Sequence, residues 1–160
     1  MNEEVKYISY EEAISVYAKM IDASDGGFDG VRDEGGIRAA LEFVQNDMYY
    51  PNFSDKLCSL VYKFCSGHYF NDGNKCIALT LGTYFLHKNS YFWQATIFMR
   101  QMESIVYHVA ASNIDKDLLL RIMTCFMNGE DYDEELKIDI ANAMSKGELG
   151  INGEDYKVKV

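Results

Sequence analysis

Residues 68–75 read His-Tyr-Phe-Asn-Asp-Gly-Asn-Lys, and their types suit chemistry on phosphate groups. Histidine gains and loses a proton near neutral pH, so His68 can accept the proton of an attacking hydroxyl as a general base. Asp72 offers a carboxylate of the kind that holds Mg²⁺ beside a nucleotide. The segment therefore predicts a proton acceptor and a metal ligand only four residues apart.

The end of the same segment predicts an anion site. Gly73 has no Cβ, so the backbone there can approach a ligand closely. The residues after it are strongly apolar and have helical periodicity, and the exposed amides and positive dipole end of a helix start attract anions. Asn74 can cap this helix or hold a phosphate oxygen, and Lys75 adds a full positive charge. We predict His68, Asp72 and Lys75 as catalytic, Asp72 as the metal ligand, and Gly73, Asn74 and Lys75 as the phosphate cradle.

The pattern around this segment predicts an all-α fold, a compact bundle of six to seven helices that positions the loop 67–73. Residues 9–12, Ser-Tyr-Glu-Glu, form a capping-box pattern before the first helix. Ser54 is predicted to cap the third helix, and the helix after Gly73 is predicted to be central and buried because it has little polar surface. Helices are expected over residues 13–21, 36–44, 55–65, 74–87, 95–111, 112–127 and 134–144.

Three segments predict minor extended structure. Residues 46–53 are rich in tyrosine and read as an aromatic loop or a small β hairpin, and residues 91–93 read as extended. Residues 156–160 alternate between apolar and polar types, as an edge strand does. We expect a helical domain over residues 1–129 and an acidic C-terminal extension over 130–160, made of a helix and a short strand.

Composition limits the class of partner. The chain has 160 residues and a formal net charge of −10, which argues against nucleic acid because phosphate backbones need basic residues facing them. The acids gather at the two ends, whereas residues 35–128 carry a net charge of +1. One interpretation is that the acidic ends are solvated and aid solubility. The other is that the middle of the chain is kept near neutral so that an anionic ligand can approach it.

The sequence also indicates a cytoplasmic protein with no membrane segment. No apolar run is long enough to cross a bilayer, and the N-terminal residues lack the basic and apolar pattern of a secretion signal. Four cysteines, Cys58, Cys65, Cys76 and Cys125, have no spacing typical of zinc or redox sites. We expect them to be reduced and buried.

Residues 68–75 resemble the signature of the Fic/Doc family, in the form typical of its Doc (death-on-curing) branch. The similarity extends to the Gly-Val-Arg-Asp segment at residues 30–33, which a short helix follows. It also extends to residues 85–89, Phe-Leu-His-Lys-Asn, which close the helix after the motif. It covers about residues 8–128 and is most specific at the motif.

This resemblance implies a toxin that transfers a group from ATP or another nucleoside triphosphate, with Mg²⁺, to a protein hydroxyl. In the Fic branch the group is usually a nucleoside monophosphate, and glycine usually stands at the position of Lys75. In the Doc branch that residue is lysine, and a phosphoryl group is placed on a translation elongation factor. Such toxins are usually paired with an antitoxin. The resemblance assigns the base to His68, the metal to Asp72 and the phosphates to residues 73–75, and it places residues 46–53 near a flap that aligns the target.

One residue departs from the family pattern. The Doc signature continues with arginine, whereas this chain has Cys76. A thiol cannot make a bidentate bond to phosphate, and an arginine on the transferred group can contribute about a thousandfold in rate or more. Two readings stay open. Arg32 or Arg38 supplies the charge from another segment and the chain is an enzyme, or the chain is a catalytically impaired scaffold that binds proteins or regulates them.

Overall fold

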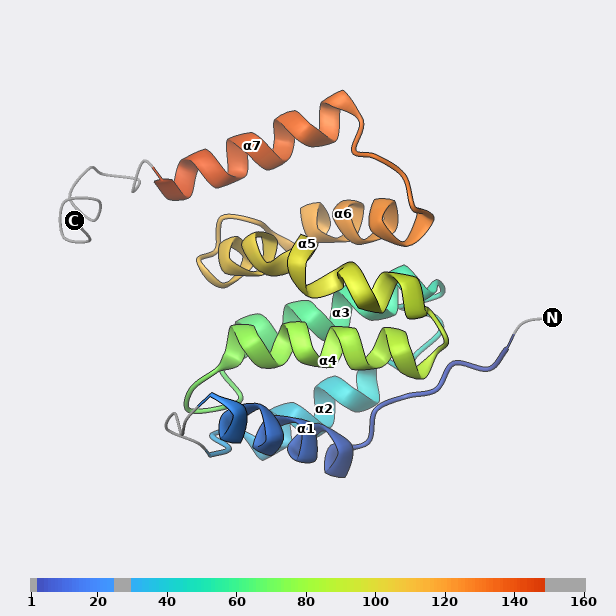
Figure 1. Cartoon of the computed structure of the whole chain (residues 1–160), viewed down its shortest axis with the longest axis vertical. Helices are drawn as coiled ribbons and strands as arrows, with labels where there is room; N and C mark the ends of the chain where they lie inside the picture. The colour runs from blue at the N-terminus through green and yellow to red at the C-terminus, as the bar shows by residue number, and fades with distance from the viewer. Residues whose placement is uncertain (1–2, 25–29, 149–160) are drawn as a thin grey trace.

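The computed structural model describes residues 3–24 and 30–148, which form seven helices and no strand. Figure 1 shows them stacked, with α1 and α2 at the bottom, α3 and α4 in the middle, and α5, α6 and α7 above. The predicted all-α fold is confirmed. The helices are α1 (Tyr10–Ala23), α2 (Glu34–Phe43), α3 (Phe53–Ser66), α4 (Asn74–Lys88), α5 (Phe92–Ala110), α6 (Lys116–Asn128) and α7 (Glu134–Glu148).

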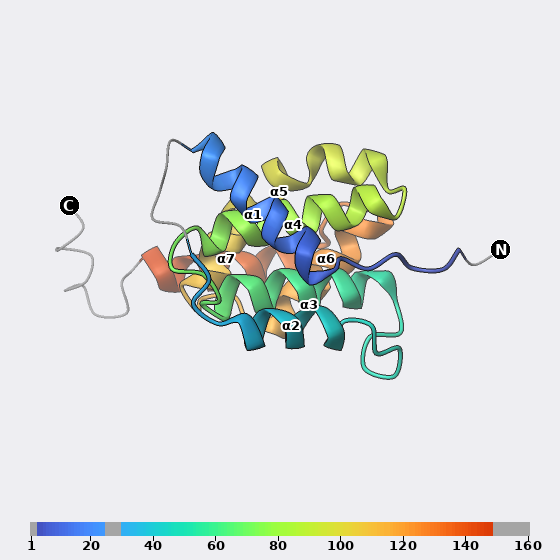
Figure 2. The same ribbon diagram turned by 90° about the horizontal axis from the view of Figure 1, so that it is seen from below.

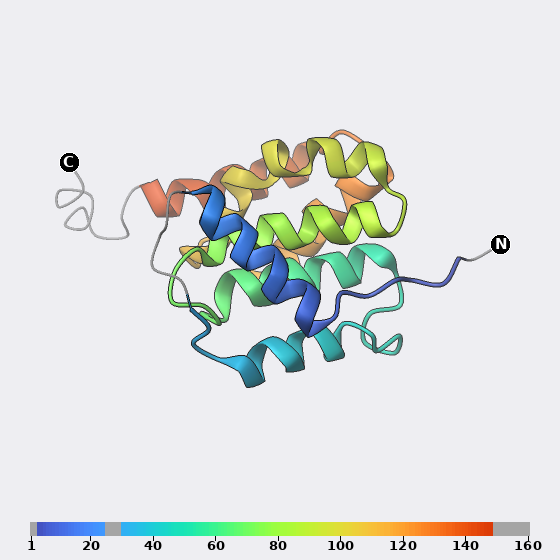
Figure 3. The same cartoon turned by 60° about the horizontal axis from the view of Figure 1, so that its bottom comes forward.

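Helix α4 lies at the centre, as its apolar sequence predicts. Its residues Ile77, Leu81 and Phe85 are almost completely buried, and α4 contacts α1, α3 and α5. Gly82 permits the closest approach to α5, because a Cβ at this position would lie 2.6 Å from the ring of Phe98. Figure 3 shows α1 crossing over α4 while α2 lies beside α3. The start of α4, which carries the motif, is therefore held from several sides.

The structure corrects several predicted boundaries. Helix α3 begins at Phe53, with Asp55 accepting a hydrogen bond from the backbone N–H of Asn52 at 2.9 Å, so Ser54 is not its cap. The prediction of extended residues 91–93 is wrong, because α5 begins at Phe92. The predicted strand at 156–160 lies outside the described residues.

Of the two alternatives predicted for residues 46–53, the aromatic loop is confirmed and the hairpin is wrong. The side chain of Asn46 accepts hydrogen bonds from the backbone N–H groups of Met48 and Tyr49 at 3.0 and 3.3 Å, which closes a turn instead of leaving these groups for a partner strand. This turn lies at the N-terminal end of α3, and the motif lies beyond its C-terminal end (Figure 2). The 14 residues of α3 separate the two by about 20 Å. The turn is therefore not a flap over the motif.

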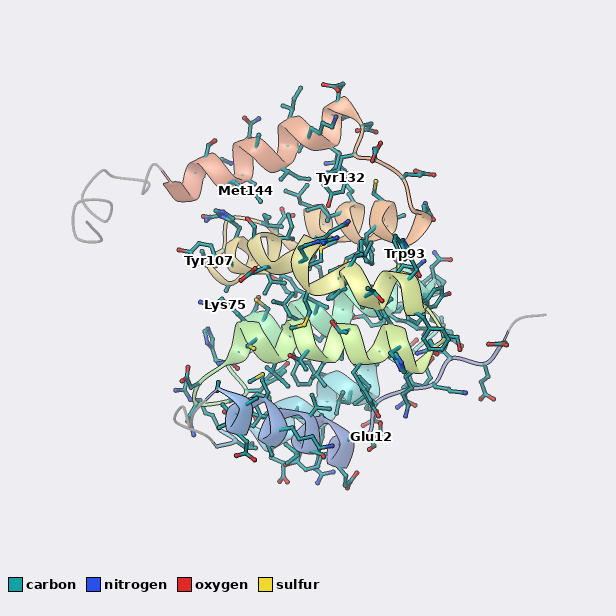
Figure 4. The ribbon with its side chains drawn as sticks, viewed as in Figure 1. Glu12, Lys75, Trp93, Tyr107, Tyr132 and Met144 are labelled. Carbon is teal, nitrogen blue, oxygen red and sulfur yellow. The ribbon has the colours of Figure 1, made fainter. Side chains whose placement is uncertain are left out.

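Helix α7 packs on the side of the bundle away from α1 and α2. Leu136, Ile140 and Ala143 share one buried face, and Tyr132 and Met144 pack beside it (Figure 4). Helix α7 ends at Glu148, one turn beyond the end of the predicted helix 134–144.

The division into a domain at 1–129 and an extension at 130–160 stays a prediction. None of the described helices is long and apolar enough to cross a lipid bilayer.

Glu12 couples the start of α1 to the end of α4. Its carboxylate accepts a hydrogen bond from the backbone N–H of Ser9 at 3.1 Å, which completes the predicted capping box, and one from the ammonium of Lys88 at 2.8 Å. Figure 4 shows Glu12 beneath α4. The hydrogen bond from Lys88 is the main reason why the pKa of Glu12 is lowered.

We expect Glu12→Ala to lower the free energy of unfolding by about 1 kcal/mol at neutral pH. Because the folded-state pKa is depressed, this stabilisation is complete above the ordinary pKa of glutamate and is lost as the pH falls through the folded value. Urea unfolding of both proteins at about pH 7 and about pH 3 measures the difference, with exposed Glu11→Ala as the control. An equal difference at both pH values would contradict the assignment.

Candidate active site

The motif loop begins with a left-handed turn at His68. This residue has φ of +51°, a conformation that histidine adopts more readily than most residues but that still costs about 1 kcal/mol or more. The turn follows Gly67, where a Cβ would lie 2.4 Å from the ring of Tyr69. The backbone thus leaves α3 abruptly and leaves His68 exposed to solvent. Strained backbone of this kind concentrates at functional sites.

Phe70 anchors the loop to the core. Its side chain is completely buried, and its ring stacks on the ring of Tyr17 with centroids 4.0 Å apart. The hydroxyl of Tyr17 also donates a hydrogen bond to the backbone carbonyl of Asp72 at 3.0 Å. Because Phe70 lies between His68 and Asp72 in sequence, this anchor fixes the positions of both candidate residues.

The segment before α2 braces the loop from its other side. The carbonyl of Tyr69 accepts hydrogen bonds from the backbone N–H groups of Arg32 and Asp33 at 2.8 and 3.0 Å. The N–H of Asn71 donates to the carbonyl of Gly30 at 3.0 Å, and Val31 and Phe70 form the single β-bridge of the described chain. Residues 30–33, not residues 46–53, therefore lie beside the motif.

The start of α4 has the features of an anion site. Gly73 has φ of +78°, and no side chain caps the helix. The amide side chain of Asn74 instead binds the backbone of Phe70, accepting from its N–H at 3.1 Å and donating to its carbonyl at 3.0 Å. Asn74 thus braces the loop with its side chain, and its contribution to an anion cradle is its backbone N–H. The first-turn amides of α4 remain available for a ligand.

These residues line one cavity of about 830 Å³, a volume typical of ligand sites. The motif loop and the start of α4 form one wall, and α5 forms the opposite wall. The predicted residues are therefore brought together around a common space. The lining includes His68, Asn71, Asp72, Gly73, Asn74, Lys75, Cys76 and Leu79 on one side, and Met99, Arg100, Glu103, Tyr107 and Ala110 on the other.

The polar wall on α5 was missed by the sequence analysis. Arg100, Glu103 and Tyr107 are spaced three and four residues apart, so they share one face of the helix. The ammonium of Lys75 lies 5.4 Å from the centre of the Tyr107 ring, and Figure 4 shows these two side chains side by side. The helical spacing of these three residues was the available signal, but nothing in the local sequence connects them to the motif.

The two arginines considered from the sequence do not line the cavity. The guanidinium of Arg38 lies 3.8 Å from the centre of the Tyr10 ring and 3.4 Å from the carboxylate of Glu34. Arg32 is held near the motif through its backbone N–H, but its side chain is absent from the cavity wall. The arginine that does reach the cavity is Arg100.

Asp72 suits a magnesium ion that is bound mainly through a nucleotide. One carboxylate oxygen accepts a hydrogen bond from the N–H of Gly73 at 2.8 Å, and the residue is exposed toward the cavity. Over residues 3–24 and 30–148, no group of three or more histidine, cysteine or acidic side chains could hold a metal by itself. Mg²⁺ often takes one or two carboxylates and completes its coordination with phosphates and water, so the residues present fit.

The four cysteines differ in burial, and the prediction that all are buried holds for Cys58 and Cys65 but is wrong for Cys76. Burial raises the pKa of Cys58 to about 12 and that of Cys65 to about 11. Cys125 is half-buried, whereas Cys76 is exposed on the cavity wall. All four are free thiols.

We expect iodoacetamide at about pH 8 to alkylate Cys76 first, because the reacting species is the thiolate and the buried thiols are neither accessible nor ionised. Peptide mapping by mass spectrometry over time gives the order. Cys76→Ser should remove the fast phase and leave Cys58 and Cys65 slow. Modification of Cys65 as quickly as Cys76 would contradict the packing described.

Comparison with known families agrees with this geometry. Residues 7–86 match the family model described as the Fic/DOC family, a stretch that runs from just before α1 to near the end of α4. A search of curated proteins found no match. The matched stretch is half of the chain and contains the whole motif loop with both of its braces, so the chain belongs to the Fic/DOC family.

Proposed function

We propose that the protein transfers a phosphoryl or nucleotidyl group from a nucleoside triphosphate to a hydroxyl of a protein substrate, as a toxin of the Doc branch. The main support is the convergence of His68, Asp72 and the uncapped start of α4 on one cavity. A base, a metal ligand and an anion-binding helix end are the parts that such a transfer requires.

In this proposal His68 takes the proton of the target hydroxyl as its oxygen attacks phosphorus. In phosphoryl transfer the new bond forms to the γ-phosphorus, the bond to the β–γ bridging oxygen breaks, and the diphosphate leaves. Asp72 would hold Mg²⁺, which neutralises phosphate charge. The backbone amide of Asn74 and the ammonium of Lys75 would hold phosphate oxygens, and Gly73, whose own N–H binds Asp72, would let the backbone approach them closely. All of these residues lie on the cavity wall, where His68, Asp72 and Lys75 are exposed and Gly73 and Asn74 are half-buried.

Lys75 favours phosphoryl over nucleotidyl transfer. The resemblance gives lysine at this position to the Doc branch and glycine to the Fic branch, and the structure holds the ammonium of Lys75 beside Tyr107 on the cavity wall. We therefore infer the γ-phosphoryl group as the one transferred, with ATP as the first nucleotide to test. A translation elongation factor is the target class that the Doc branch implies.

Residues 30–33 are the best candidate for aligning the target segment. They are hydrogen-bonded to residues 69–71 beside the cavity, and Val31 is partly exposed. The turn at residues 46–53 lies too far away for this role.

We further propose that the protein is cytoplasmic and controlled by an antitoxin, and that it has no nucleic-acid or membrane partner. The described part of α7 contributes nothing to the cavity wall, so it does not obstruct this site.

Cys76 supports a second candidate function. Its side chain lies on the cavity wall directly after Lys75, where it adds no positive charge for a triphosphate. The alternative is therefore a catalytically impaired Fic/Doc scaffold that binds or regulates another protein. Cys76→Arg separates the two, because a gain of transfer activity would identify this position as the lesion.

The test is incubation of the purified protein with a bacterial lysate, Mg²⁺ and ATP labelled at either the α or the γ phosphate. Retention of the γ label on a protein, lost on chelation of Mg²⁺, is the expected result. Retention of the α label would instead indicate nucleotidyl transfer. No label from either position in wild type and in Cys76→Arg would overturn the enzymatic proposal and favour the scaffold.

A further inference from the structure

We propose that Arg100 on α5 binds the phosphate chain of the nucleotide from the wall opposite the motif loop. This inference rests on the proposed nucleotide site. Its test, however, measures the affinity for nucleotide and does not depend on transfer of a group to protein. Arg100 lies outside the matched residues 7–86, and the cavity is the observation that connects it to the motif.

The charges on the cavity wall identify Arg100 as a candidate phosphate ligand. Lys75 and Arg100 are its two permanent cations, whereas Asp72 and Glu103 are its two carboxylates. A triphosphate remains negatively charged after it binds one Mg²⁺ ion, and Lys75 alone offers one compact positive charge. Arg100 would add a planar guanidinium that can bind two phosphate oxygens at once.

Arg100 is also free to act in this way. Its side chain is exposed and makes no ion pair or hydrogen bond with any residue of the described ranges, including Glu103 one turn away. By contrast, Arg38 pairs with Glu34, and Arg121 pairs with Asp139 at 2.7 Å. An arginine that faces a cavity without a protein partner is available to an anionic ligand.

The spacing of the two cations favours a chain of phosphates over a single one. Lys75 is held at Tyr107, and Arg100 lies seven residues before Tyr107 on the same face of α5. Seven residues correspond to about 10 Å along the helix axis. An extended ligand could therefore contact the amides of α4 and Lys75 with one part and Arg100 with another.

The test is the affinity of wild type, Arg100→Ala and Arg100→Lys for Mg²⁺-ATP and Mg²⁺-GTP, measured by isothermal titration calorimetry. With whichever nucleotide binds more tightly, we expect Arg100→Ala to weaken binding by about tenfold to a hundredfold. Arg100→Lys should lose less affinity than Arg100→Ala, since lysine keeps the positive charge but cannot bind two phosphate oxygens in the bidentate geometry. The affinity for AMP should change least, because AMP lacks the β- and γ-phosphates.

Arg38→Ala is the matched control, because it removes another exposed arginine that lies off the cavity wall. Circular dichroism melts of all variants should coincide with wild type. The proposal is overturned if wild type binds neither nucleotide, if Arg100→Ala binds as wild type does, or if Arg38→Ala loses as much affinity. Arg100-dependent binding without label transfer would uphold this inference while overturning the enzymatic proposal.

Discussion

Replacing His68 with alanine is expected to lower the rate of label transfer from ATP to protein by about a hundredfold to ten-thousandfold. The reason is that the target hydroxyl would lose its proton acceptor, while the amides of α4, Lys75 and Asp72 remain in place. The side chain of His68 is exposed, so its removal creates no cavity in the core. Transfer is measured as the initial rate of γ-label incorporation at saturating Mg²⁺-ATP.

His87→Ala is the matched control for this prediction. His87 is also exposed and lies on α4, but it is near the opposite end of the helix, where its ring contacts Phe92. We expect His87→Ala to transfer label at the wild-type rate and His68→Ala to bind Mg²⁺-ATP with unchanged affinity. Wild-type transfer by His68→Ala, or an equal loss in both variants, would exclude His68 as the base.

Replacing Phe70 with alanine is expected to destabilise the protein by about 3–5 kcal/mol, the usual cost of removing a fully buried phenylalanine. For a chain of this size, this corresponds to a fall in Tm of about 10 °C or more. The loss of the stacking contact with Tyr17 would also release the residues between His68 and Asp72. Transfer activity should therefore fall even at temperatures where the variant remains folded.

Phe92→Ala provides the comparison, because it removes the same side chain from a position that is 56% exposed. We expect its Tm to stay within a few degrees of wild type. Phe70→Leu should lie between the two, since it fills most of the space but cannot stack. If Phe70→Ala melts like Phe92→Ala, the motif loop is not anchored as described.

Features that depend on neighbours in the chain were predictable from the residues alone. The capping box at Ser9 and Glu12 and the helix that starts after Gly73 follow from local spacing and polarity. Their physical basis is short in range, since a cap, a helix dipole and an apolar stripe need only a few consecutive residues. The motif residues belong to this class, because the eight of them are contiguous.

The wrong predictions of extended structure at residues 46–53 and 91–93 came from the aromatic residues in these segments. Aromatic residues at 49–50 and 91–93 suggested extended structure. In the folded chain the side chain of Asn46 closes a turn before the first pair, and the second group holds the N-cap and first residues of α5, where Phe92 and Trp93 are exposed. β-propensity is a weak preference, so a side-chain hydrogen bond or the start of a helix overrides it.

The α5 wall of the candidate-site cavity depended on contacts between distant parts of the chain. Arg100, Glu103 and Tyr107 lie 25 or more residues after Lys75, and only the packing of α5 against α4 brings them to the motif. The pairing of residues 30–33 with residues 69–71 has the same origin. Such contacts are set by how helices orient and by which bulky side chains separate them, such as Phe98 against Gly82. The periodicity of one segment does not predict that orientation. The position of Arg100 on the cavity wall could therefore be identified only from the tertiary structure.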